Sequence, residues 1–381
     1  MSVLVASRRK LRLFMTADAV GGVWQYALDL ARGLADLDVE ITLAVLGPAP
    51  DQDQIAAAAS VPGLRLLSTG LPLDWTAAAP DEVAASAVAV AALAADAAPD
   101  IVQLNSAALG AGVHFPAPLV IACHSCVATW WNTVHDEPLP EDFIGRAKLV
   151  QQGYVAADVL VAPTAAFARL TARTYGLKTA PGVIHNGRRL VVDRPCRPTF
   201  SSSFAFTAGR LWDEGKNLAA IDRAAGRLAM PVLAAGPVAG PNGAEISLQH
   251  VRALGRLRDD EIARWLKPAP VFVSAALYEP FGLAVLEAAQ ACCALVLSDI
   301  PTFRELWDGA ALFVQPEDDA AIAAAIEQLV ADKALRAELG VAAQERSRRY
   351  SVEAMAAGMA AIYRWPPSDA AAPASCQKAI A

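Results

Sequence analysis

Two glutamates, Glu279 and Glu287, stand eight positions apart around a turn that opens a helix-forming stretch. Pro280 and Gly282 interrupt the backbone, and the run 283–291 has high helix propensity. The first N–H groups of that helix lie at its positive end, where anionic phosphates bind; they belong to Gly282, Leu283 and Ala284. One carboxylate could meet a bound sugar and the other a ribose. The plainer alternative is a turn before a buried helix, with two solvated acids.

A second set of charges follows a predicted strand over residues 204–208. The strand runs into the loop Gly209-Arg210-Leu211-Trp212-Asp213-Glu214-Gly215-Lys216-Asn217, which precedes a helical pattern. Ligands of open parallel sheets bind beyond the carboxyl ends of strands, and Arg210 and Lys216 leave such an end. Two cations there could stabilise a diphosphate leaving group. Taken alone, the pair fits a solvated loop better.

Together the two segments resemble the retaining, two-domain nucleotide-sugar glycosyltransferases of the GT-B fold, family 4 type. That family carries a Gly-Arg-Leu…Lys loop followed by two glutamates with the spacing of Glu279 and Glu287. The similarity is strongest over 204–316 and weaker in the first half. One departure is Gly215, which places Lys216 one position further from Arg210 than is usual in the family. Whether Lys216 reaches the phosphates is therefore open.

The resemblance implies transfer of a hexose from a UDP- or GDP-linked sugar to a hydroxyl, with retention, without a metal and without a cofactor. Arg210 and Lys216 would stabilise the departing diphosphate, Glu279 would orient the sugar, and Glu287 would hold the ribose. Other expected donor contacts are Gly22, Gly209, Phe281, Gly282, Leu283 and Ala284. A glycan, a lipid-linked group or a small molecule could be the acceptor.

His124 follows a predicted strand at 119–122. It resembles the family's histidine beside the transferred sugar, and we expect it to contact a sugar hydroxyl and support the developing positive charge. A lone histidine is more often a structural residue. The family often has a second histidine near the stretch 101–105, where this chain has other polar residues.

Two further pairs are candidates for the acceptor side. Gly21 and Gly22 follow the first predicted strand and open a helix, so the backbone could approach the diphosphate or the acceptor; a plain turn is the alternative. Trp130 and Trp131 are expected on a loop, where one ring could stack on an acceptor. In the alternative, one ring is buried and the other lies at a domain contact.

Strands alternate with helices along the chain, which predicts parallel sheets covered by helices on both faces. The first series of expected strands is 11–16, 39–46, 101–104, 119–122, 159–162 and 182–184. The second is 204–208, 231–235, 270–273, 294–297 and 311–314. We therefore expect two Rossmann-like α/β domains facing a cleft: an acceptor-side domain over 1–190, closed by a helix near 352–365, and a nucleotide-sugar domain over 191–351. The segment 186–203 is the expected linker, and 366–381 is an expected disordered tail.

Composition excludes several other classes of protein. The 381 residues are 55% hydrophobic with a net charge of −7, and no basic stripe indicates nucleic-acid binding. The six cysteines are irregularly spaced, which favours the cytoplasm. The longest apolar helix candidate, 83–93, is too short to cross a membrane. The basic run at 8–12 leaves a weak peripheral membrane contact open.

Metal sites and rival functions are less well supported. Asp36-Leu37-Asp38 and Asp51-Gln52-Asp53 are interpreted as solvated turns, and Cys123 and Cys126 as small buried residues. A same-fold epimerase or phosphorylase and a non-catalytic nucleotide-sugar-binding protein remain alternatives. A nicotinamide dehydrogenase is disfavoured because no glycine fingerprint follows the first strand.

Overall fold

The computed structural model describes residues 10–190 and 204–364. Contacts divide the chain into two compact units. Unit 1 comprises Met1–His124, Glu141–Val161 and Met355–Ala381, and unit 2 comprises Ser125–Pro140 and Ala162–Ala354. The predicted linker at 191–203, the basic residues before Lys10 and the tail after 364 lie outside the described residues. The predicted domain boundary near residue 190 stays a prediction.

A seven-stranded sheet forms in the described part of the first half, in the order β3-β2-β1-β4-β5-β6-β7. The strands from β3 to β6 in this order all pair in parallel with their neighbours. The strands are β1 (Leu11–Asp18), β2 (Val39–Leu46), β3 (Leu64–Ser68), β4 (Ile101–Leu104), β5 (Leu119–Ala122), β6 (Val159–Ala162) and β7 (Gly182–Val183). The associated helices are α1 (Gly22–Ala35), α2 (Gln52–Ala59), α3 (Pro80–Ala97), η1 (Ala107–Gly110), α4 (Val127–Val134), α5 (Glu141–Ala156) and α6 (Ala165–Tyr175).

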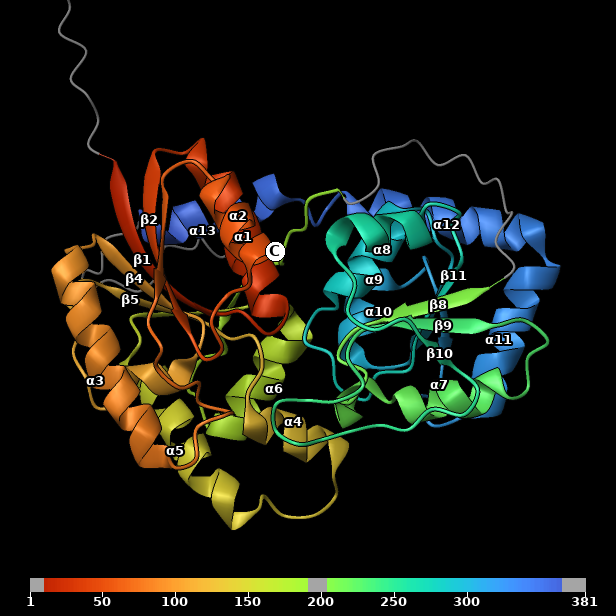
Figure 1. Cartoon of the computed structure of the whole chain (residues 1–381), viewed down its shortest axis with the longest axis horizontal. Helices are drawn as coiled ribbons and strands as arrows, with labels where there is room; N and C mark the ends of the chain where they lie inside the picture. Colours follow the sequence, from red (N-terminus) through yellow and green to blue (C-terminus); the bar gives the residue numbers. More distant parts are fainter. Residues whose placement is uncertain (1–9, 191–203, 365–381) are drawn as a thin grey trace, which may run out of the picture. The chain divides into compact units, whose positions relative to one another are not determined.

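Unit 2 holds a six-stranded sheet among its described residues, in the order β10-β9-β8-β11-β12-β13. Figure 1 labels β8, β9, β10 and β11 of this sheet. The strands are β8 (Ala205–Ala208), β9 (Val232–Ala235), β10 (Arg252–Ala253), β11 (Val271–Ser274), β12 (Leu295–Ser298) and β13 (Leu312–Val314). The helices are η2 (Glu214–Lys216), α7 (Leu218–Ala225), α8 (Asp259–Leu266), α9 (Leu283–Gln290), α10 (Pro301–Trp307), α11 (Asp319–Ala331) and α12 (Lys333–Ser347).

Successive side chains of these strands enter different cores because they point to opposite faces of the sheet. Ala205 packs with residues of α7 and α11, whereas Phe206 packs with residues of α8, α9 and α10. Figure 1 shows the same division of helices between the two faces. Both faces are covered, so strands such as β9 are continuously apolar, as expected for a buried parallel sheet. The prediction of an α/β fold with two parallel sheets is confirmed.

The predicted strands agree with the structure to within about one to two residues at each end, the usual uncertainty of element limits. Two short strands, β3 and β10, were not predicted. β10 is two exposed residues, and β3 has only partly buried apolar positions, so neither shows a strong apolar run. The prediction that Trp130 and Trp131 lie on a loop is wrong, because both belong to α4. Helix α4 has just eight residues, and two adjacent tryptophans obscured its periodicity.

The last described helix, α13 (Val352–Tyr363), matches the predicted closing helix in its limits. Its residues from Met355 onward belong to unit 1. There the Tyr363 hydroxyl donates a hydrogen bond to Oε1 of Gln103 on β4. Gln103 is fully buried and also donates to the Tyr26 hydroxyl at 3.3 Å, so the end of the chain joins a polar network inside unit 1.

Candidate active site

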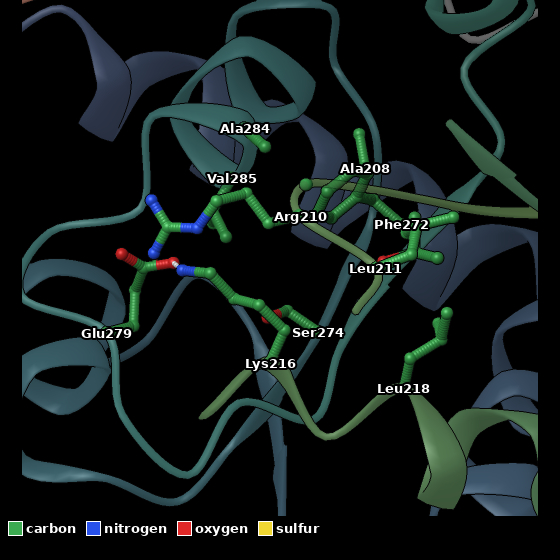
Figure 2. A pocket seen from close by; sticks show the side chains of 12 residues that line it. Ala208, Arg210, Leu211, Lys216, Leu218, Phe272, Ser274, Glu279, Ala284 and Val285 are labelled. Carbon is green, nitrogen blue, oxygen red and sulfur yellow. Dashed lines mark hydrogen bonds and ion pairs between the residues drawn. The ribbon is translucent and has the colours of Figure 1, made fainter. Parts of the chain in front are cut away.

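A small hollow, open to solvent, lies beside the carboxyl ends of β8 and β11 in unit 2. This is the edge at which open parallel sheets bind ligands. Its walls include five predicted site residues: Gly209, Arg210, Lys216, Glu279 and, near the start of α9, Ala284. Figure 2 shows the charged ends of Arg210, Lys216 and Glu279 turned toward one another on one side of the hollow.

Lys216 and Glu279 form an ion pair in this structure. The Lys216 ammonium Nζ lies 2.6 Å from Oε2 of Glu279, and both side chains are mostly buried. The two residues are 63 positions apart in the chain. Lys216 therefore does reach the second candidate segment despite the extra residue before it. An ammonium has three donors, so Lys216 can keep Glu279 and still contact an incoming anion.

The extra residue, Gly215, explains this reach. Its carbonyl oxygen accepts hydrogen bonds from the N–H groups of Leu277 (2.9 Å) and Tyr278 (3.1 Å), which ties the two loops together directly before Glu279. A Cβ atom on Gly215 would lie 2.8 Å from the Trp130 indole nitrogen, closer than packing permits. The next residue, Asn217, donates to the Ala275 and Pro316 carbonyls at 3.0 and 2.7 Å. Lys216 is thus held from both sides.

Asp213 holds the second cation of this loop, Arg210, in place. Its Oδ2 accepts from Arg210 Nη2 at 2.7 Å, and its Oδ1 accepts from Trp130 Nε1 at 3.1 Å and from the Gly215 N–H at 3.0 Å. Burial disfavours the ionised form, but the charges of Arg210 and Lys216 outweigh it and hold the pKa of Asp213 below its usual range. Sequence reasoning missed Asp213, because an Asp in a loop has no distinctive pattern.

Trp130 therefore has a different place from the one predicted. Its indole nitrogen is bound to Asp213, so the residue contacts the Arg210 loop inside unit 2. Trp131 donates from Nε1 to the Glu137 carbonyl at 2.8 Å and stacks on the His135 ring at 4.0 Å between centroids. An acceptor-binding role for either tryptophan stays a prediction.

The turn at 278–280 is fixed by two neighbouring helices of unit 2. The Tyr278 hydroxyl lies 2.8 Å from the Thr129 hydroxyl on α4. Thr164, the N-cap of α6, donates to the Pro280 carbonyl at 3.1 Å. Glu279 lies between these two contacts, so its backbone is held before any ligand binds.

Helix α9 begins as predicted, with Gly282 as its N-cap at φ +93°, a conformation that favours glycine. A Cβ there would also lie 3.1 Å from the Phe303 ring. The Phe281 ring is buried in the core, so a donor contact by Phe281 would use its backbone. Leu283 is the first helical residue, and Ala284 borders the hollow.

Glu287 is already engaged by another residue. Its Oε1 lies 2.6 Å from Nε of Arg188, whose side chain is 1% exposed. Arg188 also reaches Asp259, the first residue of α8, at 2.9 Å. Sequence reasoning placed Arg188 in a linker and did not consider it. The sequence marks Arg188 only by the adjacent pair Arg188-Arg189 in a segment without clear periodicity. Such pairs are too common to indicate a functional residue.

His124 belongs to unit 1, as do Gly21 and Gly22. Its Nε2 lies 3.0 Å from Oδ1 of Asn105. The Asn105 amide nitrogen donates to the Thr16 carbonyl at 2.6 Å, which identifies Oδ1 as an acceptor and therefore places the imidazole proton on Nε2. Burial lowers the pKa of His124 to about 4, so the ring is neutral near pH 7 and Nδ1 carries a lone pair.

The glycine pair stands where the sequence placed it. Gly22 begins α1, Gly21 is its N-cap, and the Gly21 N–H donates to Oδ1 of Asp18 at 3.2 Å. A backbone approach to a ligand stays a prediction for both glycines.

The two Asp pairs have local roles in unit 1. Asp51 caps α2 by accepting from the Gln54 N–H, and Asp53 lies in the first turn of that helix rather than in a loop. Asp36 is the C-cap of α1. Within 10–190 and 204–364, no group of three or more histidines, cysteines or acids is arranged to hold a metal. None of the helices over the same residues is long and apolar enough to cross a membrane.

Two family models match the chain. The model for Glycosyltransferase Family 4 matches residues 20–190, and the model for Glycosyl transferases group 1 matches residues 245–346. Among solved structures, sucrose-phosphate synthase from Thermosynechococcus elongatus aligns with a TM-score of 0.76 at 18% identity, covering 93% of this chain and 98% of that one. Anabaena HepE, in complex with UDP and glucose, aligns with a TM-score of 0.68 at 16% identity, covering 92% and 99%.

Two curated relatives share a shorter stretch. Phosphatidyl-myo-inositol mannosyltransferase of Mycolicibacterium smegmatis is 37% identical over 117 residues, which is 30% of each chain. The protein of the same name from Mycobacterium leprae is 32% identical over 119 residues, 30% of this chain and 32% of that one. The matched part spans less than a third of either relative. Both matched families are families of glycosyltransferases, and the solved neighbours share the fold of this chain. The matches over 20–190 and 245–346 confirm the resemblance to family 4-type glycosyltransferases that was found in the sequence.

Proposed function

We propose that the chain transfers a hexose from a nucleoside diphosphate sugar to a hydroxyl acceptor, with retention and without a metal ion. One observation carries this proposal: Arg210 and Lys216 converge with Glu279 at the hollow on the carboxyl edge of the six-stranded sheet. Two fixed cations there can stabilise the negative charge that develops on a departing diphosphate. They supply the charge that a divalent cation supplies elsewhere.

The proposed roles follow from the placement of each group. The first turn of α9 directs its N–H groups toward an anion beside Ala284, and Glu279 orients hydroxyls of the transferred sugar. The bond between the sugar C1 and the phosphate oxygen breaks, the acceptor oxygen bonds to C1 from the same face, and its proton passes to the departing phosphate oxygen. Glu287 binds the ribose. His124, neutral near pH 7, offers its Nδ1 lone pair to a sugar hydroxyl.

The comparisons support particular substrates. HepE is solved with UDP and glucose, which supports a UDP-linked donor. The curated relatives are named as mannosyltransferases acting on phosphatidyl-myo-inositol, which supports a hexose and keeps a GDP-linked donor and a lipid-linked acceptor among the candidates.

The test is thermal unfolding with a panel of UDP- and GDP-sugars in the presence of EDTA. A ligand at about 100 times its Kd stabilises the folded protein by about 2.7 kcal/mol, which is a clear rise in Tm. We expect one donor to raise Tm, and we expect Lys216→Ala and Arg210→Ala to abolish that rise. Arg227→Ala is the matched control, because Arg227 is an exposed cation paired with Asp319 at 2.6 Å.

Product analysis separates the rival functions. Incubation with donor and candidate acceptors should yield a glycoside whose anomeric configuration matches that of the donor. Conversion of the donor alone into an isomeric nucleotide sugar would establish an epimerase. A donor that binds but is never turned over would favour a non-catalytic binding protein. A rise in Tm that disappears in EDTA would refute the metal-independent site.

A further inference from the structure

Arg188 is a buried cation that the donor-site roles above do not use. Its side chain is 1% exposed, and it lies between two carboxylates, those of Glu287 (2.6 Å) and Asp259 (2.9 Å). A buried charge is costly unless it is paired and hydrogen-bonded, so an arginine kept here is bound firmly by its partners.

The backbone of Arg188 is held as firmly as its guanidinium. Its carbonyl oxygen accepts from Nε2 of Gln290 at 2.8 Å, and its N–H donates to the Tyr350 carbonyl at 3.3 Å. Gly187 allows this approach, since a Cβ there would collide with the Ser351 carbonyl. Gln290 and Glu287 are three positions apart on α9, so they share a helix face and both contact Arg188.

A glutamate side chain on a helix normally samples several rotamers, and ordering it costs free energy when a ligand binds. The contact with Nε of Arg188 removes much of that freedom before any ligand arrives. A carboxylate has about four lone-pair positions, so a Glu287 held by Arg188 keeps acceptor capacity for ribose hydroxyls.

We propose that Arg188 is a positioning residue for the donor nucleotide: it holds the Glu287 carboxylate oriented for the ribose hydroxyls, and Asp259 binds the other side of its guanidinium. This inference rests on the proposed function, because it assumes that Glu287 meets a ribose. Arg188 itself touches neither the sugar nor the phosphates. It acts through Glu287, so its effect is specific to the ribose hydroxyls.

The experiment measures Kd by calorimetry for UDP, GDP and ADP, and then for the 2′-deoxy and 3′-deoxy forms of the nucleotide that binds most tightly. In the wild-type protein we expect loss of a hydroxyl bound by Glu287 to weaken binding on the order of tenfold or more. Glu287→Gln should reduce this ratio of deoxy to ribo Kd toward one. Arg188→Gln should reduce it as well, and the double variant should be no worse than either single variant.

Arg189→Gln is the matched control. Arg189 follows Arg188 in the chain and contacts the same Asp259 at 3.2 Å, but its side chain is 51% exposed. The Arg189→Gln variant should leave the ratio of deoxy to ribo Kd unchanged. If Arg188→Gln fails to fold, Arg188→Lys takes its place: a lysine keeps the charge, but its compact ammonium lacks the planar fork that serves two carboxylates, so the ratio should still fall.

Each result decides between distinct conclusions. If Glu287→Gln lowers the ratio but the Arg188 variant keeps it within about twofold of wild type, the proposed function stands and the role of Arg188 is refuted. Independent, additive effects of the two substitutions would refute it too. If the wild-type protein binds none of the three nucleotides, or does not distinguish the deoxy forms, the ribose assignment fails and the inference fails with it.

Discussion

The Asp213 carboxylate joins two parts of the site. One oxygen accepts hydrogen bonds from Trp130 and Gly215, and the other accepts from Arg210. We predict that Asp213→Asn destabilises the protein by about 1–3 kcal/mol at pH 7, because a buried charge-assisted network loses its anion. The folded-state pKa is depressed, so this stabilisation exists above the unfolded pKa of about 3.9 and is lost as the pH falls through the folded value. Urea denaturation should therefore show a gap between wild type and variant that narrows below about pH 4. A gap that is constant with pH would contradict the assignment.

His124 should also make stability depend on pH. Here the group is a base that stays neutral in the folded protein, whereas Asp213 is an acid that stays charged. Its folded pKa of about 4 lies below the unfolded value of about 6.5, so the unfolded chain binds more protons between these values. Stability of the wild-type protein should fall as the pH is lowered from about 6.5 to about 4, and His124→Gln should flatten that part of the curve. His114→Gln, at an exposed position, is the control. An unchanged slope in His124→Gln would show that folding does not lower the pKa of this ring.

At the scale of elements, the short helix η2 and helix α4 fit together around Gly215. We predict that Gly215→Ala costs about 1–3 kcal/mol of stability, because the new Cβ meets the Trp130 indole nitrogen at 2.8 Å. The displaced loop carries Lys216, so binding of the donor that stabilises the wild-type protein should weaken as well.

A second substitution tests whether that contact is the cause. Trp130→Phe removes the nitrogen that the Cβ would meet, so Gly215→Ala should cost less in the Trp130→Phe background than alone. Equal costs in both backgrounds, measured by urea denaturation, would place the strain elsewhere in the loop.

At the scale of the whole molecule, the chain returns at α13 to the unit in which it began. Tyr363 is buried there, and its hydroxyl donates to the fully buried Gln103. We predict that Tyr363→Phe leaves an unsatisfied amide oxygen in unit 1 and costs about 1–3 kcal/mol, measured by chemical denaturation. The neighbouring Arg364→Ala, which removes an exposed contact with the Leu37 carbonyl at 3.0 Å, should change stability by less than about 0.5 kcal/mol. If Tyr363→Phe and Arg364→Ala change the free energy of unfolding equally, the buried network contributes little to stability.

The sequence by itself determined the elements and the class of protein. Apolar runs and helical periods are local signals, and they placed strands such as β2, β4 and β5 with their observed limits. The spacing of Glu279 and Glu287 is also local, since it depends only on a turn and the helix that follows. Candidate donor-site residues on these two loops could therefore be proposed without coordinates. The weak signals were those of short elements, such as α4 and β10, whose few residues cannot establish a period.

Tertiary structure decided which side chains meet. Lys216 and Glu279 are 63 positions apart, Trp130 and Asp213 are 83 apart, and Arg188 and Glu287 are 99 apart. No periodicity within one element encodes such pairs, because they depend on the order of strands in a sheet and on the path of the loops between them. Trp130 thus became a support for the Arg210 loop, and Arg188, placed in a linker by its sequence, became the partner of Glu287. Charges that look solvated in a sequence acquire a function when the backbone brings an opposite charge to them in a place that excludes water.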